Sequence, residues 1–336
     1  MSNAPAVVVT SIAAPNGVLR QIAADCIARE LHFYLIGDHK SPADFELDGC
    51  DFYSLQRQRE LRFETARHSL AGSYARKNIG YLLAMQQGCT SIIETDDDNL
   101  PRADFYQPLP LLQTVPVVRA TGWVNVYRYF SDTSVWPRGL PLDAVHDEVP
   151  ALPHAAVAVA CPIQQGLADD NPDVDAVYRL LMPLPVVFRK GVRVALGSGA
   201  WCPFNSQNTV FWPDAFPLLY LPSHCSFRMT DIWRSFVAQR IAWENGWHVL
   251  FREATVTQLR NDHSLMKDFA EEVPGYLHNR KIAETLAALA LEPGVDAIPR
   301  NLRAAYGSLI QLGVIGDREM PLLEAWLADL QSLGLR

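Results

Sequence analysis

Runs of consecutive apolar residues alternate with stretches of helical periodicity along the first part of the chain. The β-branched run at 6–12 predicts a strand buried on both faces of a parallel sheet, and residues 32–38 predict a second strand. Between them, apolar residues recur at helical spacing from Leu19 to Ile27. The order strand, helix, strand predicts an α/β fold whose first loop lies at the carboxyl edge of the sheet, where open α/β sheets bind ligands.

The same pattern continues into the second quarter of the chain. Residues 74–87 predict a helix that ends at Gly88, and residues 90–99 predict the next strand. No GxGxxG motif accompanies these elements, so the pattern does not support a dinucleotide fingerprint. Further strand candidates are residues 115–122, 185–191 and 246–253.

The last third of the chain changes in character. Residues 230–245 predict a helix with Thr230 as its N-cap and Gly246 as its stop. Beyond it, three leucine-rich amphipathic segments predict a helical extension. We therefore expect an α/β domain with a mostly parallel central sheet over residues 1–264 and a helical C-terminal extension over residues 265–336.

Composition and charge exclude several classes of protein. The 336 residues are 49% hydrophobic and 20% charged, which is ordinary for a globular chain. A net charge of −8 does not provide the basic surface that nucleic acids require, so we expect no nucleic-acid partner. There is no run of eighteen apolar residues, no secretory signal pattern and no CxxC pair among the six cysteines. We expect no membrane span, a cytoplasmic location and reduced thiols.

Asp96, Asp97 and Asp98 follow a predicted buried strand, and Glu94 precedes them by two positions. On an extended backbone, Asp96 and Asp98 would face one side and Asp97 the other. Carboxylates at the mouth of a sheet suit a hard divalent cation, whose open positions a diphosphate would fill. The alternative is a solvated acidic turn, or a turn in which Asp and Asn cap the next element.

The segment 73–99 (SYARKNIGYLLAMQQGCTSIIETDDDN) resembles the STELLO-type (DUF288) glycosyltransferase-like family. Shorter motifs carry the same resemblance in order along residues 7–265, namely SIAAPN, VWPRGLPL, QQGLADDNPDVDAVYRL, PFNSQNTVFW and SFRMTDIWRSFVAQR. The chain is more distantly similar to the reversibly glycosylated polypeptides, which are UDP-arabinopyranose mutases. Both resemblances imply a GT-A-type, Rossmann-like nucleotide-sugar-binding domain, in which a DxD motif holds Mn²⁺ or Mg²⁺ on the diphosphate.

The resemblance implies which residues bind the nucleotide. Asp38 would accept hydrogen bonds from the base or ribose, Arg76 and Asn78 would contact the same part of the ligand, and Asp97 would lie beside it. Asp38 could instead be a loop or capping residue, and Arg76 could be a surface cation paired with Glu64 or Asp98.

A polar segment follows two glycines and supplies candidates for binding sugar hydroxyls, namely Asn205, Ser206, Gln207 and Asn208. Trp201 or Phe204 could stack on a sugar face. The alternative is a polar turn that leads into a helix.

Three further residues receive roles from the resemblance. Asp231, in the first turn of its predicted helix, would be the general base, although the helix dipole alone also favours a carboxylate there. His263 would be a third metal ligand beside Asp96 and Asp98. Arg138 matches the arginine that carries the sugar in the reversibly glycosylated polypeptides.

The resulting expectation is a metal-dependent glycosyltransferase that uses a nucleotide diphosphate sugar, with UDP as the expected nucleotide, and an acceptor that is a glycan or another molecule. One alternative is a UDP-sugar mutase that glycosylates itself at Arg138. Another is a non-catalytic nucleotide-sugar-binding partner of a different glycosyltransferase. The sequence leaves open the donor's base and sugar, the acceptor, the stereochemical outcome, and whether the chain forms a homo-oligomer.

Overall fold

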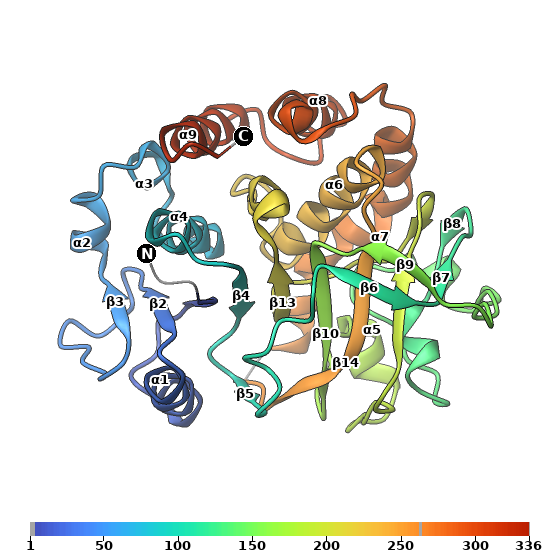
Figure 1. Cartoon of the computed structure of the whole chain (residues 1–336), viewed down its shortest axis with the longest axis horizontal. Helices are drawn as coiled ribbons and strands as arrows, with labels where there is room; N and C mark the ends of the chain where they lie inside the picture. The colour runs from blue at the N-terminus through green and yellow to red at the C-terminus, as the bar shows by residue number, and fades with distance from the viewer. Residues whose placement is uncertain (1–3, 262–263, 336) are drawn as a thin grey trace.

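The centre of the molecule is one large mixed β-sheet in a computed structural model that describes residues 4–261 and 264–335 (Figure 1). In order across the sheet, the strands are β3 (Asp51–Tyr53), β2 (His32–Ile36), β1 (Ala6–Thr10), β4 (Ile92–Thr95), β13 (Asn208–Phe211), β10 (Ile163–Asp169), β14 (Val249–Gln258), β11 (Arg193–Leu196) and β7 (Val117–Val118). A short strand, β5 (Asn99–Pro101), pairs with β14. Two small sheets pair β8 (Gly122–Trp123) with β12 (Ala200–Trp201), and β6 (Leu112–Val115) with β9 (Val157–Ala160).

The α/β class is confirmed, but the sheet is mixed rather than mostly parallel. Strands β3, β2, β1 and β4 are parallel, as the apolar runs near the N-terminus predict. β13 runs antiparallel to both of its neighbours, β4 and β10, and β11 runs antiparallel to β14. The chain enters β13 from the irregular middle of the sequence and runs there in the direction opposite to β4 and β10.

Helices cover both faces of the N-terminal half of the sheet. Alternate β1 side chains enter two separate hydrophobic clusters, so that Val8 packs with α4 (Lys77–Gln87) and Val7 packs with α1 (Gly17–Arg29). Gly80 allows α4 to lie close to the sheet, because a β-carbon there would come within 2.5 Å of a Val8 methyl group. The predicted stop at Gly88 is confirmed by its left-handed backbone, with φ 77°.

The remaining helices are α2 (Leu55–Arg59), α3 (Glu64–His68), α5 (Ala176–Leu181), α6 (Thr230–Glu244), α7 (Leu265–Ala287), α8 (Ile298–Gln311) and α9 (Glu319–Ser332). None of the helices within the described residues combines the length and apolar character needed to cross a bilayer.

Two local predictions are wrong. Thr230 is the first residue of α6 rather than its N-cap, because a 3₁₀ turn at Phe227–Met229 runs directly into the helix and leaves no side-chain cap. Residues 185–191 do not form a strand, and Val186 makes one isolated bridge to Asp170. The apolar residues of that segment are therefore not part of the sheet.

Residues after 264 form the helices that the sequence predicts, and these helices pack on the rest of the chain. Figure 1 shows α8 and α9 in red above the N-terminal helices and α6. The Asp329 carboxylate in α9 accepts hydrogen bonds from the first amides of α3, at Glu64 (2.8 Å) and Thr65 (2.7 Å). Trp326 and Leu286 belong to the same hydrophobic cluster as sheet residues such as Phe251.

Candidate functional site

A cleft of about 750 Å³ lies where the parallel strands β1, β2 and β4 reach their carboxyl ends. This volume is within the range of ligand pockets, and this edge is where open α/β sheets bind ligands. Eight of the sequence-predicted residues line the cleft together, namely Asp38, Arg76, Asp96, Asp97, Asp98, Arg138, Gln207 and Asp231.

The three consecutive aspartates form a turn at the floor of this cleft, and we call Asp96–Asp98 the aspartate turn. The chain leaves β4 at Thr95 and turns at Asp97 and Asp98 before β5 begins. The predicted alternation, with Asp97 facing away from its neighbours, is wrong, because the extended backbone ends before the aspartates and all three line the cleft. The turn brings more carboxylate to the cleft than a strand would.

Side chains from the loop after β1 and from the end of β14 hold the aspartate turn in place. The Asp97 carboxylate accepts hydrogen bonds from the Ser11 hydroxyl and the Asn261 amide (3.2 Å). Asn16, which also caps α1, donates to the Asp97 carbonyl (2.9 Å). The Asp98 carboxylate accepts a hydrogen bond from the Asn261 backbone (3.2 Å). Burial raises the pKa of Asp97, and the Ser11 bond opposes that rise.

Side chains of the described residues donate to only one carboxylate oxygen of Asp96. Its Oδ1 accepts from the buried Lys77 ammonium at 2.9 Å, and 32% of its side chain is exposed. Its Oδ2 accepts no hydrogen bond from any residue that the structure describes. Burial raises the pKa of Asp96, and Lys77 opposes the rise.

Protein cations therefore compensate part of the acidic charge beneath the cleft. Lys77 also donates to the carbonyls of Thr95 (2.8 Å) and Ser206 (3.3 Å), so its ammonium is fixed under the turn. Glu94 lies buried in β4, two residues before Asp96, and pairs with Arg234 at 2.7 Å. The sequence analysis did not single out Lys77. Its position at the start of the helix that precedes β4 is the signal that could have identified it.

At the end of the cleft beside β2, Asp38 and Arg76 are already engaged by the protein. The Asp38 carboxylate accepts from the backbone of Gly72 (2.7 Å) and Ser73 (3.2 Å), as well as from His39. Burial alone would raise the pKa of Asp38, but these hydrogen bonds hold it below its ordinary value. The Arg76 guanidinium donates to Gln58 and to two backbone carbonyls. Both residues therefore shape the loop that forms this end of the cleft.

Of the predicted amide residues, only Gln207 lines the cleft. Its side-chain amide makes no hydrogen bond to any described residue, which leaves it available to a ligand. Asn205 and Asn208 are buried and bonded inside the sheet region. Asn78 exchanges two hydrogen bonds of 2.9 Å with the backbone of Leu221. These three asparagines therefore stabilise the fold around the cleft and do not line the cleft itself.

The sequence analysis missed an exposed aromatic side chain that lines the cleft. Trp201 and Phe204, the predicted stacking residues, are buried and do not line the cleft. Phe227 lines it with 54% of its surface exposed and packs edge-on against Tyr74, with ring centroids 6.0 Å apart. An exposed aromatic ring in a polar cleft is the kind of surface that a sugar face can cover.

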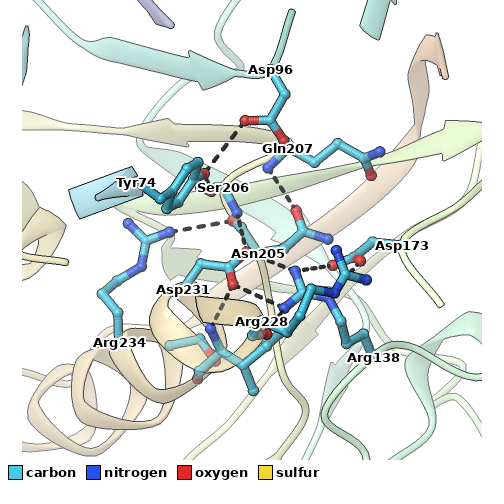
Figure 2. Close-up of polar contacts among 12 residues, drawn as sticks. Tyr74, Asp96, Arg138, Asp173, Asn205, Ser206, Gln207, Arg228, Asp231 and Arg234 are labelled. Atoms are coloured by element: carbon cyan, nitrogen blue, oxygen red, sulfur yellow. Dashed lines mark hydrogen bonds and ion pairs between the residues drawn. The ribbon is translucent and has the colours of Figure 1, made fainter. Parts of the chain in front are cut away.

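Arg138 forms ion pairs with two aspartates in the cleft, and we call Asp173, Arg138 and Asp231 the Arg138 triad (Figure 2). The guanidinium donates to both oxygens of Asp173 (2.7 and 2.9 Å) and to both oxygens of Asp231 (3.0 and 2.9 Å). Its fifth N–H donates to the carbonyl of Arg228. All five donors of this arginine are therefore used.

The opposite charges in the triad shift the pKa values of Arg138 and Asp231 in the directions that favour their charged forms. Burial opposes the charged form of Arg138, but Asp173 and Asp231 outweigh it and raise the pKa of Arg138 well above its ordinary value. Burial would raise the pKa of Asp231, but Arg138 outweighs it and holds that pKa below its ordinary value. Asp231 also accepts hydrogen bonds from the backbone of Ser206 and Ile232. Such a carboxylate is a weak base.

His263, the predicted third metal ligand, lies outside the described residues. Within residues 4–261 and 264–335, no three His, Cys, Asp or Glu side chains are arranged to hold a metal ion together. The cation ligands available there are the carboxylates of the aspartate turn, whose oxygen chemistry suits Mn²⁺ or Mg²⁺.

Comparison with known proteins identifies the chain's relatives. The family model of the STELLO glycosyltransferases matches residues 228–336. Two curated proteins of Arabidopsis thaliana, "Probable glycosyltransferase STELLO2" and "Probable glycosyltransferase STELLO1", are each 30% identical over 323 residues. These alignments cover 89% of this chain and 41% of each relative, so the chain spans about two fifths of the length of the curated relatives it matches. Residues 228–336 therefore match the STELLO glycosyltransferase family model, and the similarity to two STELLO proteins extends over most of the chain.

Proposed function

We propose that this chain transfers a sugar from a nucleotide diphosphate sugar, with UDP as the nucleotide, to an acceptor bound in the same cleft. The observation that carries the proposal is the position of the aspartate turn. Three carboxylates line a ligand-sized cleft at the carboxyl edge of the sheet, and the Oδ2 atom of Asp96 accepts no hydrogen bond from the described residues. An acidic floor would repel a diphosphate unless a cation lies between them.

The donor set at the aspartate turn fits a divalent cation. Mg²⁺ in phosphate-transfer sites is usually held through one or two carboxylates together with substrate phosphates, so a complete cage of protein ligands is not required. Asp96 and Asp98 are the residues that would hold it. When bound, the cation supplies charge that stabilises the departing diphosphate.

The chain's own residues then bind and orient the substrate. Lys77 holds Asp96 with its Oδ2 unpaired, and Ser11 and Asn261 fix the turn. The unbonded amide of Gln207 is available to sugar hydroxyls. In the transfer, the bond between the anomeric carbon and the diphosphate oxygen breaks as the acceptor oxygen bonds to that carbon, and the acceptor's proton passes to a basic oxygen.

The geometry disfavours Asp231 as that base. A general base works best with a pKa near the working pH, whereas Arg138 holds the pKa of Asp231 below its ordinary value. Asp231 would therefore position Arg138 and the Ser206 backbone beside the sugar site and would not take the proton.

The geometry also disfavours self-glycosylation at Arg138. A nucleophilic guanidinium must lose a proton and free a nitrogen. All five donors of Arg138 are used, and its two aspartates raise its pKa. A mutase that labels Arg138 is therefore the weaker alternative. A non-catalytic nucleotide-sugar-binding protein uses the same cleft, and product analysis separates it from a transferase.

The test is a thermal-shift panel of UDP, GDP and ADP, each with Mn²⁺, with Mg²⁺ or with EDTA. We expect UDP with metal to stabilise the fold by about 2.7 kcal/mol at one hundred times its dissociation constant, and much less with EDTA. Equal shifts with and without metal would contradict a metal-binding role for the aspartate turn. Incubation with labelled UDP-sugars and analysis for free UDP and glycosylated product would then separate transfer from binding alone.

A further inference from the structure

Arg179 lies in the cleft wall without a carboxylate partner among the described residues. It comes from α5, and its guanidinium makes one hydrogen bond within the described chain, from Nη2 to the Pro172 carbonyl at 2.7 Å. Its Nε is buried and has no hydrogen-bond partner. A guanidinium carries five donors and is seldom left this poorly bonded in a partly buried position.

The acidic groups nearest to Arg179 are committed to other arginines. Asp173 gives both of its oxygens to Arg138. Glu272 is fully buried and gives Oε1 to Arg228 (3.0 Å), while its Oε2 accepts from the Ala176 backbone (2.7 Å) and from a tyrosine hydroxyl. No rotation of these carboxylates could serve Arg179 without breaking a buried ion pair.

Two more arginines line the same part of the cleft, and we call Arg179, Arg228 and Arg260 the arginine wall. Arg228 pairs with Glu272, and Arg260 pairs with Asp268 at 2.8 Å. Burial, together with the positive charge of Arg260, lowers the pKa of Arg179 to about 10. Arg228 and Arg260 each pair with a carboxylate, whereas Arg179 forms no ion pair with any residue that the structure describes, so its charge is compensated less directly than theirs.

Arg179 and Asp96 are influenced by different charged groups, although Asp98 of the aspartate turn also acts on Arg260 of the arginine wall. The charges acting on Arg179 are those of Arg260, Asp173, Arg228 and Glu272. Those acting on Asp96 are Lys77, Asp98 and Asp231. A diphosphate neutralised by a cation at the turn therefore leaves the charge of Arg179 unmatched.

We propose that Arg179, with Arg228 and Arg260 beside it, binds an oxyanion group of the acceptor, so that the acceptor is an anionic molecule carrying a phosphate or a carboxylate. The assignment to the acceptor rests on the proposed transfer function. The planar guanidinium of Arg179 offers its unbonded N–H groups to two oxygens at once.

The experiment measures the binding of three matched hexose probes by calorimetry, namely glucose 6-phosphate, glucuronate and uncharged glucose. The proteins are the wild type, Arg179→Gln, Arg179→Lys and the control Arg189→Gln, whose arginine is half-exposed and pairs with Asp132 on the surface. We expect wild type and control to bind at least one charged probe and not glucose. Arg179→Gln should bind that probe at least about tenfold more weakly, and Arg179→Lys should lie between, since it keeps the charge and loses the fork.

The same proteins are titrated with UDP and Mn²⁺ to separate the two sources of an anion. If Arg179→Gln leaves UDP binding unchanged and the charged probe binds together with UDP, the acceptor assignment stands. If UDP with Mn²⁺ displaces the probe and the variant weakens both, Arg179 serves the donor diphosphate and the acceptor assignment is overturned.

Two further results have definite meanings. Equal binding of the charged probes by wild type and Arg179→Gln, or no binding by either, overturns the subsite. Binding of the probe that depends on Arg179 in a protein that does not bind UDP with metal supports the anion subsite and removes the proposed donor function. A melting temperature within a few degrees of wild type, expected because Arg179 has few partners to lose, shows that each variant is folded.

Discussion

Two groups of aspartates face the same cleft, and they differ in what compensates their charge. In the Arg138 triad, each carboxylate receives two hydrogen bonds from one buried guanidinium, and no side chain of the triad is more than 10% exposed. In the aspartate turn, Asp96 has one lysine contact, keeps Oδ2 unpaired and is 32% exposed. The triad therefore has the character of fixed architecture, whereas the turn has the character of a site that a ligand completes. Counting carboxylates in the sequence does not distinguish them.

Removing the cation of the triad should give the largest effect. Arg138→Met leaves two buried carboxylates next to each other without compensation, and breaking a buried pair in this way costs about 3–5 kcal/mol. Urea denaturation at pH 7 measures the loss. The control Arg189→Met removes a surface pair and should change stability by less than about 0.5 kcal/mol. A loss for Arg138→Met as small as that of the control would show that the triad is not structural.

The loss of stability in Arg138→Met should also depend on pH, and the direction of that dependence can be predicted. The folded-state pKa of Asp231 lies below the ordinary value of 3.8, so its contribution to stability is present above that value and is lost as pH falls through the folded pKa. Without Arg138, burial would instead raise the pKa of Asp231, and protonation at low pH would relieve the cost of its buried charge. The difference in unfolding free energy between wild type and Arg138→Met should therefore shrink from pH 7 to pH 4. A constant difference would contradict this account.

The second prediction concerns the aspartate turn. Asp96→Asn should abolish most of the metal-dependent stabilisation by UDP, which is about 2.7 kcal/mol at one hundred times the dissociation constant. The matched variant Asp173→Asn removes a carboxylate of the triad and should keep that increment, measured against its own ligand-free form. The readout is the melting temperature with UDP, in Mn²⁺ and in EDTA. Equal loss in both variants would erase the distinction between the two clusters.

Sequence patterns predicted the parts of the fold that depend on neighbours along the chain. β1, β2 and β4 follow from uninterrupted apolar runs, and α4 follows from its periodicity and its glycine stop. The orientation of β13 depends on pairing with β4 and β10, which lie more than forty positions away, and its four residues carry no directional signal. The pattern of apolar and polar residues therefore could not predict the antiparallel pairing in the second half of the sheet.

The residues of the candidate site likewise separate into those that the sequence predicted and those that it did not. The aspartate turn and Asp38 were predicted because strand ends mark a ligand-binding edge. The triad was not, because its arginine and aspartates are 35 and 93 positions apart and only folding brings them together. Phe227 was missed because exposure, and not residue type, distinguishes it from the buried Trp201.

The third prediction concerns Asp231, which the sequence analysis proposes as the general base. Asp231→Asn keeps the Arg138–Asp173 pair but loses charge-assisted hydrogen bonds, which should cost about 2 kcal/mol of stability. Because the pKa of Asp231 is held low, the rate of sugar transfer should fall less than the hundredfold that loss of a general base usually causes. Single-turnover rates at a temperature where both proteins are folded measure this. A larger fall with unchanged stability would restore Asp231 as the base.

The smallest expected effect belongs to Phe227, which is a member of neither cluster. Its ring is more than half exposed, so Phe227→Ala should change stability by less than about 0.5 kcal/mol. If the ring covers a sugar face, its loss should weaken UDP-glucose with Mn²⁺ by about 1 kcal/mol, roughly fivefold, and leave UDP itself unchanged. The ratio of the two dissociation constants is the sensitive quantity, because a displaced Tyr74, which packs against Phe227, would weaken both ligands together. Phe227→Tyr keeps the ring and should keep the ratio. Equal weakening of UDP and UDP-glucose by Phe227→Ala would mean that the ring supports the nucleotide end of the cleft through Tyr74 and does not contact the sugar.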